Sequence, residues 1–436
     1  MLLQVLVLSM KEDQEIQLGQ VLGINPNYVL RKDCGVGTLC EGDKVFETIP
    51  HHKNFLSHIH LFTARLFSCF DGKRTLKEAV ELAADLLDIP FELCLKQTLL
   101  YINNKDVISN KIGNAWQAIP ENMLVPIEDK VAYKSYDPGV FYAEKYDFTP
   151  PNRLPTPLSI NILLTMKCMT DCIYCYANRS IRNHPAFDLQ SIINLIRTAK
   201  RSGVVKVDIN GGDVLSYPHW FEVVEALLEN GYTPLISTKI PIGKKEIDKL
   251  ISLGISRIQI SLDTINPSVC SSLLRVQGEQ YVNRVKNTLQ LIDKTDIEVQ
   301  INSVITCKNS DIDNMNSLVD FLARHSCVKQ ITFTPAGYSI YNRPYSAFAP
   351  SDKHVKALTK ELDEVVRFKY PWIKFSISSG EIHPHMHRSE ERFSNRTFCT
   401  ANTRNAVILP DGRMTICEEL YENPTFIIGD LKQESS

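Results

Sequence analysis

From Pro157 onward the sequence alternates between short apolar runs and amphipathic stretches. Apolar residues recur at helical spacing over about 188–202, 217–230, 243–253, 279–294 and 311–326. The runs typical of buried strands are PLSINILLT, VVKVDIN, PLISTK, RIQISLD, EVQINSVIT and KQITFTPA. Six successive strand–helix units predict parallel strands joined by right-handed crossovers, and therefore an α/β fold with an open or partial barrel. In such folds reactive groups collect at the carboxyl ends of the strands.

The region from about 18 to 110 is predicted to be a compact unit of its own. The segment GTLCEGDKVFETI has alternating apolar positions around Gly42 and Asp43, which predicts a hairpin. Three helical stretches follow: HLFTARLFSCF, TLKEAVELAADLL with Thr75 as its cap, and PFELCLKQTLLYI. A small sheet followed by three helices indicates a winged-helix-like domain. Residues 111–155 lack a sustained period and carry scattered prolines, so we interpret them as a linker.

Composition narrows the class of protein. With 436 residues the chain should hold two or three domains, and 44% hydrophobic with 22% charged residues is typical of globular proteins. The formal net charge of −2 provides no basic field for nucleic acid or anionic lipid. The apolar start MLLQVLVLSM lacks the basic residues and cleavage site of a signal peptide, and no run reaches a membrane-spanning length. We therefore expect a cytoplasmic protein that binds neither nucleic acid nor membrane.

Three of the twelve cysteines fall within eight residues, as Cys168-x3-Cys172-x2-Cys175, directly after the first predicted barrel strand. In an intracellular enzyme such crowding indicates metal or catalysis. Three thiolates on one short loop can hold three irons of a 4Fe-4S cubane and leave the fourth iron without a protein ligand. The alternatives are a structural zinc site or three unrelated buried thiols. Zinc usually takes paired CxxC knuckles, and no second knuckle follows within the next few dozen residues.

The spacing CxxxCxxC, with the aromatic Tyr174 just before the third cysteine, resembles the signature of the radical S-adenosylmethionine (SAM) superfamily. The resemblance covers roughly residues 155–340. It implies a partial (β/α)6 TIM-type radical SAM barrel over 156–345, with a 4Fe-4S cluster whose open iron binds SAM. It further implies reductive cleavage of SAM to a 5'-deoxyadenosyl radical, with an electron donor such as flavodoxin or ferredoxin.

The second strand ends in Gly211, Gly212 and Asp213, where glycines let a ligand approach the backbone closely. In the superfamily the matching segment receives the methionine amino group of SAM, and most members carry Glu at the position of Asp213. The resemblance thus makes these three residues candidates for SAM binding.

Polar residues also end the next strands. Ser237 and Thr238 end the third strand, where they either bind the ribose of SAM or satisfy the turn backbone. Ser261 and Asp263 end the fourth strand, and Arg275 follows on the next loop. In relatives this stretch helps to hold SAM and shape the substrate cavity, and the alternative is a solvated Asp and Arg. Asn302 on the fifth strand is either part of this site or a polar residue facing the barrel.

The tail from about 381 begins with the His-rich EIHPHMHRSEERF, followed by Cys399, an Asp411-Gly412 turn and Cys417. This order resembles the first half of SPASM domains, which carry auxiliary iron–sulfur clusters, and a hairpin at the turn would bring Cys417 back toward Cys399. The later clustered cysteines of such domains do not follow. We expect residues 381–436 to be a partial, apparently truncated SPASM/twitch-like segment with a possible auxiliary iron–sulfur cluster. The histidines His383, His385 and His387 are expected to be solvated.

The amino-terminal unit, 18–110, resembles the PqqD-like recognition elements of enzymes that mature ribosomally synthesised and post-translationally modified peptides (RiPPs). The resemblance lies in NPNYVLRKDCGVGTLCEGDKVFETI, FDGKRTLKEAVELAADLL and YINNKDVIS. Those elements bind the leader of a precursor peptide as an added strand, and we expect the receiving edge strand within 38–48. A winged helix can instead bind DNA, but ten Lys and Arg against eleven Asp and Glu between 20 and 110 leave no basic face.

Together these patterns predict a radical SAM peptide maturase that captures a leader and takes hydrogen from a core residue, giving a thioether or carbon–carbon crosslink or an epimerised centre. One alternative is a maturase of a folded protein, of the type that makes formylglycine in sulfatases. Another is a non-catalytic peptide-binding scaffold whose three cysteines hold zinc.

Overall fold

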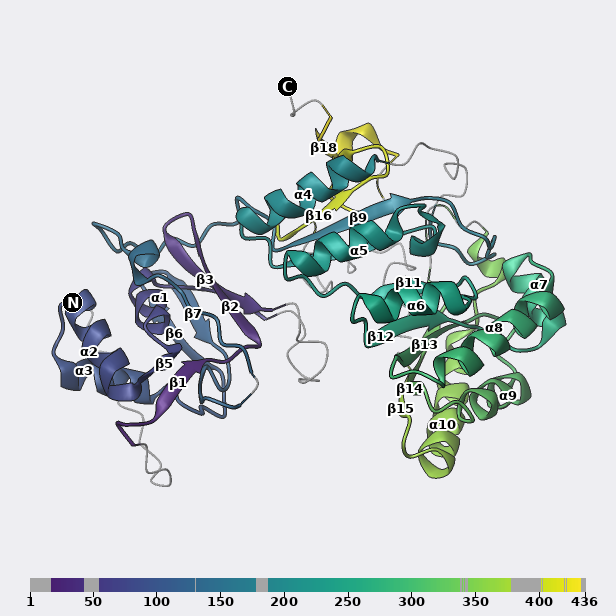
Figure 1. Ribbon diagram of the computed structural model, residues 1–436, viewed down its shortest axis with the longest axis horizontal. Coiled ribbons are helices and arrows are strands. Elements are labelled where there is room, and N and C mark those ends of the chain that lie inside the picture. The colour runs from purple at the N-terminus through teal and green to yellow at the C-terminus, as the bar shows by residue number, and fades with distance from the viewer. Residues whose placement is uncertain are drawn as a thin grey trace. The chain divides into compact units, whose positions relative to one another are not determined.

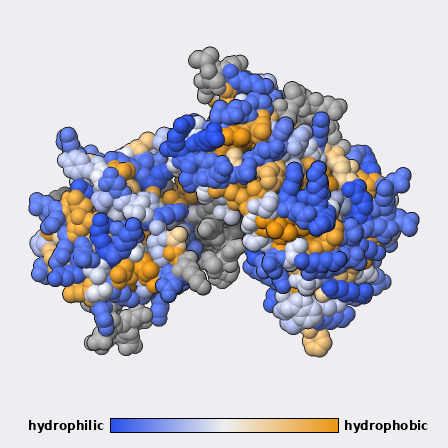
Figure 2. All heavy atoms as spheres, in the orientation of Figure 1, coloured by the Kyte–Doolittle hydropathy of each residue, from blue (hydrophilic) through white to orange (hydrophobic). Residues whose placement is uncertain are grey.

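The chain divides into two compact units, Met1–Leu158 and Ser159–Ser436. The computed structural model describes residues 17–42, 55–129, 131–177, 187–337, 344–377, 403–418 and 422–432, together with 339, 341, 401 and 420. Figure 1 shows the elements of both units, and each unit is described by itself below. None of the helices in the described part of the chain combines the length and apolar character that a membrane crossing requires. In Figure 2 the visible surfaces are mostly hydrophilic, with apolar residues in smaller patches between.

The first unit combines three small sheets with three helices. Its helices are α1 (Leu61–Ser68), α2 (Leu76–Leu87) and α3 (Phe91–Leu99), which confirms the three predicted helices. One sheet has the order β5-β1-β8, from β5 (Asp71–Thr75), β1 (Val21–Ile24) and β8 (Leu124–Pro126). A second has the order β2-β3-β4, from β2 (Tyr28–Asp33), β3 (Val36–Glu41) and β4 (Leu56–Ile59), and β6 (Ile108–Ile112) pairs with β7 (Ala115–Ile119).

Helix α2 begins as the sequence predicts. The Thr75 hydroxyl accepts a hydrogen bond from the Glu78 backbone N–H, and the Glu78 carboxylate accepts from the Thr75 backbone N–H. This reciprocal capping box satisfies two backbone donors that the helix start leaves without partners. The helix ends at Asp88, whose left-handed conformation (φ 53°) stops the chain from continuing helically.

The predicted edge strand within 38–48 is wrong for its described part. Strand β3 pairs antiparallel with β2 on one side and with β4 on the other, so residues 38–41 lie in the middle strand of their sheet. The turn preceding β3 lies at Cys34-Gly35, where both residues have positive φ, and it joins β2 to β3. The hairpin partner predicted beyond Gly42 falls on residues outside the described part.

The predicted linker, 111–155, differs from the structure in its first part. Strand β7 pairs with β6 along its length, and β8 pairs with β1 through Leu22↔Pro126 and Ile24↔Leu124. Farther along, the hydroxyl of Tyr136 accepts a hydrogen bond from the Leu30 backbone N–H at 3.1 Å. These residues therefore belong to the first unit. The sequence did not predict their strands because each strand is too short to give a clear period.

The second unit confirms all six predicted barrel strands and the five helices predicted between them. The strands are β9 (Ser159–Thr165), β10 (Lys206–Gly211), β11 (Ile236–Thr238), β12 (Arg257–Ser261), β13 (Glu298–Ile305) and β14 (Val328–Pro335). The helices are α4 (Leu189–Arg201), α5 (Trp220–Glu229), α6 (Lys244–Ser252), α8 (Gly278–Ile292) and α9 (Ile312–Leu322). Every ladder between these strands is parallel. In Figure 1 the helices lie along one face of the strands.

The structure adds elements that the sequence patterns did not predict. Helix α7 (Pro267–Leu274) precedes α8, and α10 (Asp352–Lys369) with β15 (Lys374–Ile377) extends the core beyond residue 345. In the tail, β16 (Asn405–Ile408) and β17 (Arg413–Thr415) form the predicted hairpin, with Gly412 at φ 90°, and β18 (Ile427–Asp430) follows. Strand β16 also pairs parallel with β9, so the tail adds strands to the sheet of β9 and β10, while β11 to β15 form a second sheet.

Removing the α2 cap should loosen the first turn of that helix. Replacing Thr75 by Ala is expected to raise the hydrogen-exchange rate of amides 76–79 about fivefold, since an N-cap side chain contributes about 1 kcal/mol. Thr75→Ser keeps the hydroxyl and should exchange like the wild type. Equal rates for Thr75→Ala and wild type, measured by hydrogen-exchange mass spectrometry, would show that the capping box contributes nothing.

Candidate active site

The three clustered cysteines lie on the loop that follows β9, at the carboxyl end of that strand. Cys172 is buried, and Cys168 and Cys175 are partly buried. The Thr170 hydroxyl lies 3.3 Å from the sulfur of Cys168 and 3.3 Å from that of Cys172, so the first two thiols flank one side chain. Burial raises the pKa of the Cys172 thiol, and the nearby Lys239 cation opposes that rise. A metal bound there would favour the thiolate directly.

The cysteine loop is fixed on helix α7. The backbone N–H groups of Asp171 and Ile173 donate to the carbonyls of Leu274 and Leu273, both at 2.9 Å. These carbonyls are at the helix end, where no intrahelical donor remains for them. Arg275, the left-handed residue that ends α7, donates to the Asp171 carboxylate at 2.6 Å. The loop conformation is thus set mainly by backbone hydrogen bonds.

Gly211 and Gly212 bring the end of β10 against the start of the cysteine loop. The Gly212 N–H donates to the Thr165 carbonyl at 2.7 Å, and the Asp213 N–H donates to the Lys167 carbonyl at 3.0 Å. A Cβ on Gly211 would lie 2.1 Å from the Thr165 oxygen, and one on Gly212 would lie 2.2 Å from the Lys167 oxygen. Only glycine fits this backbone approach, and φ of 137° at Gly211 reinforces the requirement.

Asp213 connects the ends of β10 and β11. Its buried carboxylate accepts hydrogen bonds from the Thr238 hydroxyl (3.0 Å) and from the backbone N–H groups of Lys239 (2.7 Å) and Leu215 (3.0 Å). Burial raises the pKa of Asp213, and these donors oppose the rise. The Thr238 hydroxyl also accepts from the Ile240 N–H. Both side chains are therefore engaged in the strand ends, which matches the alternative of a satisfied turn backbone for Thr238.

A buried ion pair lies between the strand ends and the cysteine loop. The Lys239 ammonium is 2.8 Å from the Asp263 carboxylate and 2.7 Å from the Tyr174 hydroxyl, and that hydroxyl donates to Asp263. Burial is the largest single effect and would lower the pKa of Lys239, but Asp263 and the neighbouring cysteines together outweigh it, and the pKa lies above its ordinary value. Burial and the same carboxylate raise the pKa of Tyr174 well above its ordinary value. Asp263 also accepts from the Val304 N–H at 2.9 Å.

The remaining candidate residues are distributed as follows. Ser237 on β11 donates to Gln259 on the neighbouring strand β12. Ser261, also on β12, accepts from Gln259 at 2.9 Å. Asn302 on β13 accepts from Gln300 at 3.1 Å. Arg275 is half-exposed and paired with Asp171, so it contacts the loop and not the strand ends. The patterns did not single out Lys239, although it directly follows Ser237 and Thr238.

The tail contributes Glu418, the residue after the partly buried Cys417. Its carboxylate accepts from the Asn161 amide of β9 at 3.2 Å and from the Tyr176 hydroxyl at 3.4 Å. Tyr176 directly follows Cys175, so a tail residue reaches the cysteine loop. Cys399 and the histidines His383, His385 and His387 lie outside the described residues.

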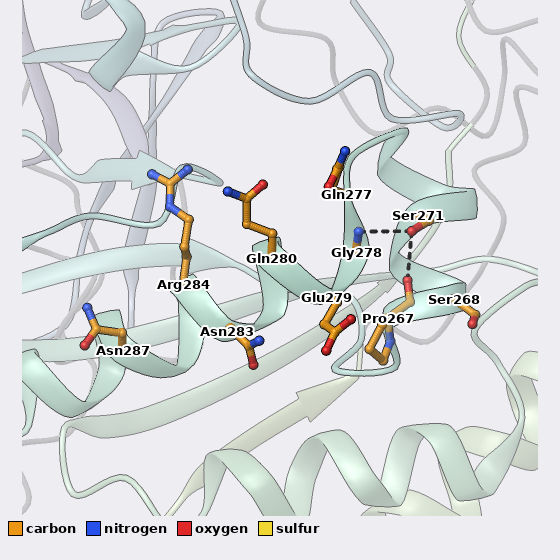
Figure 3. Close-up of a pocket in the computed structure, with 10 residues that line it drawn as sticks. All are labelled: Pro267, Ser268, Ser271, Gln277, Gly278, Glu279, Gln280, Asn283, Arg284 and Asn287. Carbon is orange, nitrogen blue, oxygen red and sulfur yellow. Dashed lines mark hydrogen bonds between the residues drawn. The ribbon is translucent and has the colours of Figure 1, made fainter.

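A cavity of about 860 Å³ lies elsewhere, over the surface of α7 and α8 (Figure 3). Its lining includes Gln277, Gln280 and Arg284, on the side of α8 opposite its buried residues. Gly278 packs against α7, where its N–H donates to the Ser271 hydroxyl and that hydroxyl donates to the Pro267 carbonyl. A Cβ on Gly278 would lie 1.9 Å from that carbonyl. The cavity is a polar groove on this helix corner, separate from the cysteine loop.

The described residues fit an iron–sulfur cluster with one open corner. Three thiols extend from one short loop, and the glycine approach packs the end of β10 against the start of that loop. Across the described ranges, no group of three or more His, Cys, Asp or Glu side chains is arranged to hold a single metal ion. Sulfur ligands of a tetrahedral zinc would lie within about 4 Å of each other. The arrangement therefore gives no support to the zinc alternative.

Comparison with known proteins places residues 162–322 in the Radical SAM superfamily. Over 265 residues the chain is 24% identical to the probable GTP 3',8-cyclase of Methanothermobacter thermautotrophicus, spanning 60% of this chain and 84% of that protein. It is 28% identical over 131 residues to the PqqA peptide cyclase of Ruegeria pomeroyi, spanning 30% of this chain and 35% of that protein.

Among solved structures, Streptococcus suis SuiB has a similar fold. Its crystal structure matches with a TM-score of 0.62 at 15% identity, covering 94% of this chain and 86% of SuiB. SuiB bound to its precursor peptide SuiA matches with a TM-score of 0.59 at 16% identity, covering 92% and 84%. SuiB has also been crystallised with S-adenosylmethionine. Radical SAM enzymes use a 4Fe-4S cluster and SAM, and these are the cofactors of a domain of this family.

Adding one methyl group at the glycine approach should disturb the cysteine loop. Gly212→Ala is expected to lower iron uptake on anaerobic reconstitution to less than half, because the Lys167 carbonyl must move to make room. Gly337→Ala is the matched control, since its Cβ would meet nothing within 4 Å. Equal iron content in the two variants would contradict the requirement for glycine.

Removing one partner of the buried ion pair should lower the free energy of unfolding more than removing both charges. Lys239→Met leaves the Asp263 carboxylate buried without its cation, which is expected to lower the free energy of unfolding by about 3–5 kcal/mol. The double variant Lys239→Met/Asp263→Asn should recover a large part of that loss. Urea unfolding of both variants and of Asp263→Asn completes a double-mutant cycle. If the loss in free energy of unfolding of the double variant equals the sum of the two single losses, the two charges do not interact.

Proposed function

We propose that this chain, a radical SAM enzyme, modifies a ribosomally made precursor peptide. The observation that carries the peptide assignment is the extent of the likeness to SuiB, which includes the first unit as well as the barrel. SuiB binds the precursor peptide SuiA, and one curated relative is a peptide cyclase.

In this proposal Cys168, Cys172 and Cys175 hold the 4Fe-4S cluster, and the backbone at Gly211 and Gly212 receives the methionine end of SAM. The chemistry supplied by the bound pair is reductive cleavage of SAM to a 5'-deoxyadenosyl radical, which abstracts hydrogen from the substrate. The close backbone approach at the glycines supports the SAM assignment, since it holds the end of β10 beside the start of the cysteine loop.

The chain's own groups then have positioning roles. Asp213 holds the ends of β10 and β11 together, so we assign it to the architecture of the SAM site and not to direct contact with SAM. Lys239 and Asp263 fix Tyr174, and with it the last turn of the cysteine loop. Ser261, which lies two residues before Asp263 on β12, is placed to contact SAM or substrate. Ser237 and Thr238 are assigned to the strand ends, and Arg275 to holding the loop through Asp171.

We assign leader capture to the first unit, as an added strand on a sheet edge. Strand β3 is excluded because it has a ladder partner on each side. In the described residues of this unit the strands with a ladder partner on one side only are β2, β4, β5, β6, β7 and β8. The Tyr136 hydroxyl already takes the Leu30 N–H of β2, which counts against β2 as the receiving strand.

A crosslink removes two hydrogens from the peptide: one leaves as a hydrogen atom to the 5'-deoxyadenosyl radical, which becomes 5'-deoxyadenosine, and the second leaves as a proton and an electron. The electron requires an acceptor, and we assign this role to an auxiliary iron–sulfur cluster held in part by Cys399 and Cys417. An epimerisation instead needs a hydrogen atom returned to the peptide. The contact of Glu418 with Tyr176 supports a tail that lies beside the cysteine loop.

The similarity to probable GTP 3',8-cyclases makes GTP cyclisation the second candidate. A nucleoside triphosphate needs several cationic side chains for its phosphates. Lys239 in the barrel is paired with Asp263, which favours the peptide over GTP.

Reconstitution under anaerobic conditions tests the cofactor assignment. The wild-type protein is expected to bind about four irons or more and, with dithionite, to release 5'-deoxyadenosine from SAM. Replacing Cys168, Cys172 and Cys175 by Ala should abolish this release, whereas Cys34→Ala, at an exposed cysteine of the first unit, serves as the control. Full release by the triple variant would overturn the cluster assignment.

Co-expression with a candidate precursor peptide, chosen as a small reading frame found beside the gene, tests the substrate. Mass spectrometry should show a loss of two hydrogens for a crosslink, or one deuterium gained in D2O for an epimerised centre. The same protein should leave GTP unchanged under reducing conditions with SAM. An unmodified peptide together with conversion of GTP would replace the maturase proposal by the cyclase.

A further inference from the structure

Three glutamines stand side by side on the central barrel strands. Gln259 of β12 is the register partner of Gln300 on β13, and Gln300 is the partner of Gln330 on β14. Each donates to the polar residue two positions farther along its own strand: Gln259 to Ser261 (2.9 Å), Gln300 to Asn302 (3.1 Å) and Gln330 to Thr332 (3.2 Å). Ser237 on β11 donates to Gln259.

These residues occupy the face of the sheet opposite the helices. Along β13 burial alternates strictly, with Val299 and Ile301 fully buried among the helices and Gln300 and Asn302 partly exposed between them. The same alternation holds on β14, where Ile331 is buried and Gln330 and Thr332 are not. Since strand neighbours point to opposite faces, the polar side chains line the inner side of the barrel.

We name this inner surface the amide wall and define it by its uncharged members. They are Ser237, Gln259, Ser261, Gln300, Asn302, Gln330 and Thr332. The inner layers of closed barrels are usually filled by bulky branched residues such as Val, Ile and Leu. Burying amides and hydroxyls costs free energy unless they have hydrogen-bonding partners. Gln300 and Gln330 each use one amide N–H toward their own strand, so these two partly exposed amides keep hydrogen-bonding capacity for a polar, uncharged ligand.

We propose that the amide wall binds the backbone of the substrate peptide, an inference that rests on the proposed function and names the residues that read the substrate. A carboxamide both donates and accepts, which matches the alternating N–H and C=O groups of an extended peptide. The cations flanking the wall are Lys239, held by Asp263, Arg257, held by Glu298, and the exposed Lys374 at the start of β15. Because two of these three cations are neutralised by a carboxylate, the wall itself complements a neutral chain.

The location suits hydrogen abstraction. Ser261 lies two residues before Asp263, and therefore about 7 Å from it along the strand. The Asp263 carboxylate accepts a hydrogen bond from the Tyr174 hydroxyl of the cysteine loop, and the Lys239 ammonium contacts both groups. A peptide lying on the wall would thus pass beside the carboxyl ends of the strands, where the cysteine loop lies. Gln300 and Gln330 would then contact the part of the peptide that lies farther from the cysteine loop than the residue that loses hydrogen.

Substitution of one amide tests the wall in the reconstituted full-length enzyme. The probe is the precursor peptide that the wild type modifies, and KM for peptide and for SAM are measured separately. Gln300→Leu keeps the approximate size and removes the amide, so KM for the peptide should rise about three- to tenfold, as expected for one lost hydrogen bond to an uncharged partner. More 5'-deoxyadenosine should also form per modified peptide, because SAM cleavage is then followed less often by hydrogen abstraction from the loosely bound peptide.

Gln190→Leu is the matched control. Gln190 lies exposed on α4 and donates to Asn194 at 3.1 Å, the same distance and the same type of acceptor as in the Gln300–Asn302 pair. It should leave KM for the peptide unchanged. Thermal unfolding verifies that each variant is folded, and if Gln300→Leu is not, Gln330→Leu on β14 is measured in the same way.

The outcomes separate the inference from the function beneath it. If the wild type modifies the peptide and Gln300→Leu or Gln330→Leu raises KM for the peptide, the amide wall is supported. If wall and control variants behave alike, or if KM changes for SAM and not for the peptide, the inference is overturned while the maturase function stands. If the wild type does not modify the peptide, the proposed function itself fails.

Discussion

The approach of two backbone segments at the carboxyl ends of β9 and β10 is the constraint on which the rest of the site depends. The Thr165 carbonyl accepts from Gly212, and the Lys167 carbonyl accepts from Asp213, immediately before the first cysteine of the loop. Neither contact leaves room for a Cβ on the glycines. The entry angle of the cysteine loop is therefore set by main-chain geometry, which is more rigid than any arrangement of flexible side chains.

The buried ion pair of Lys239 and Asp263 adds to the backbone contacts that hold the site. Lys239 lies among Asp263, Tyr174 and the thiol of Cys172, and the neighbouring negative groups keep it charged in spite of burial. Such a pair contributes little net stability relative to an apolar alternative, but it penalises any arrangement in which one partner moves away. The strand ends and the loop are thus coupled: the position of Tyr174 depends on β11 and β12 as well as on its own segment.

The barrel was readable from the sequence because its strands and helices have clear periods, and because the cysteine spacing and the Gly211-Gly212 pair are local features. Lys239 was missed because its partner, Asp263, is 24 residues away, and only the fold brings them together. The predicted edge strand failed for a similar reason, since β4 returns to pair with β3 after a long intervening segment. Helix α7 is short and rich in serine, which gives it a weak apolar period, and the linker strands are too short to show one.

The pairing of β16 with β9 has a consequence for how the protein is made. The Ser159 hydroxyl donates to the Asn405 side chain across 246 positions of sequence, and the ladder between these strands has the same separation. Closing so large a loop is entropically unfavourable, so high-contact-order pairing of this kind forms slowly. During synthesis the first barrel strand must wait until β16, 246 positions later, has left the ribosome, with one edge uncovered in the meantime. Its nascent form is correspondingly exposed to chaperones and to mispairing.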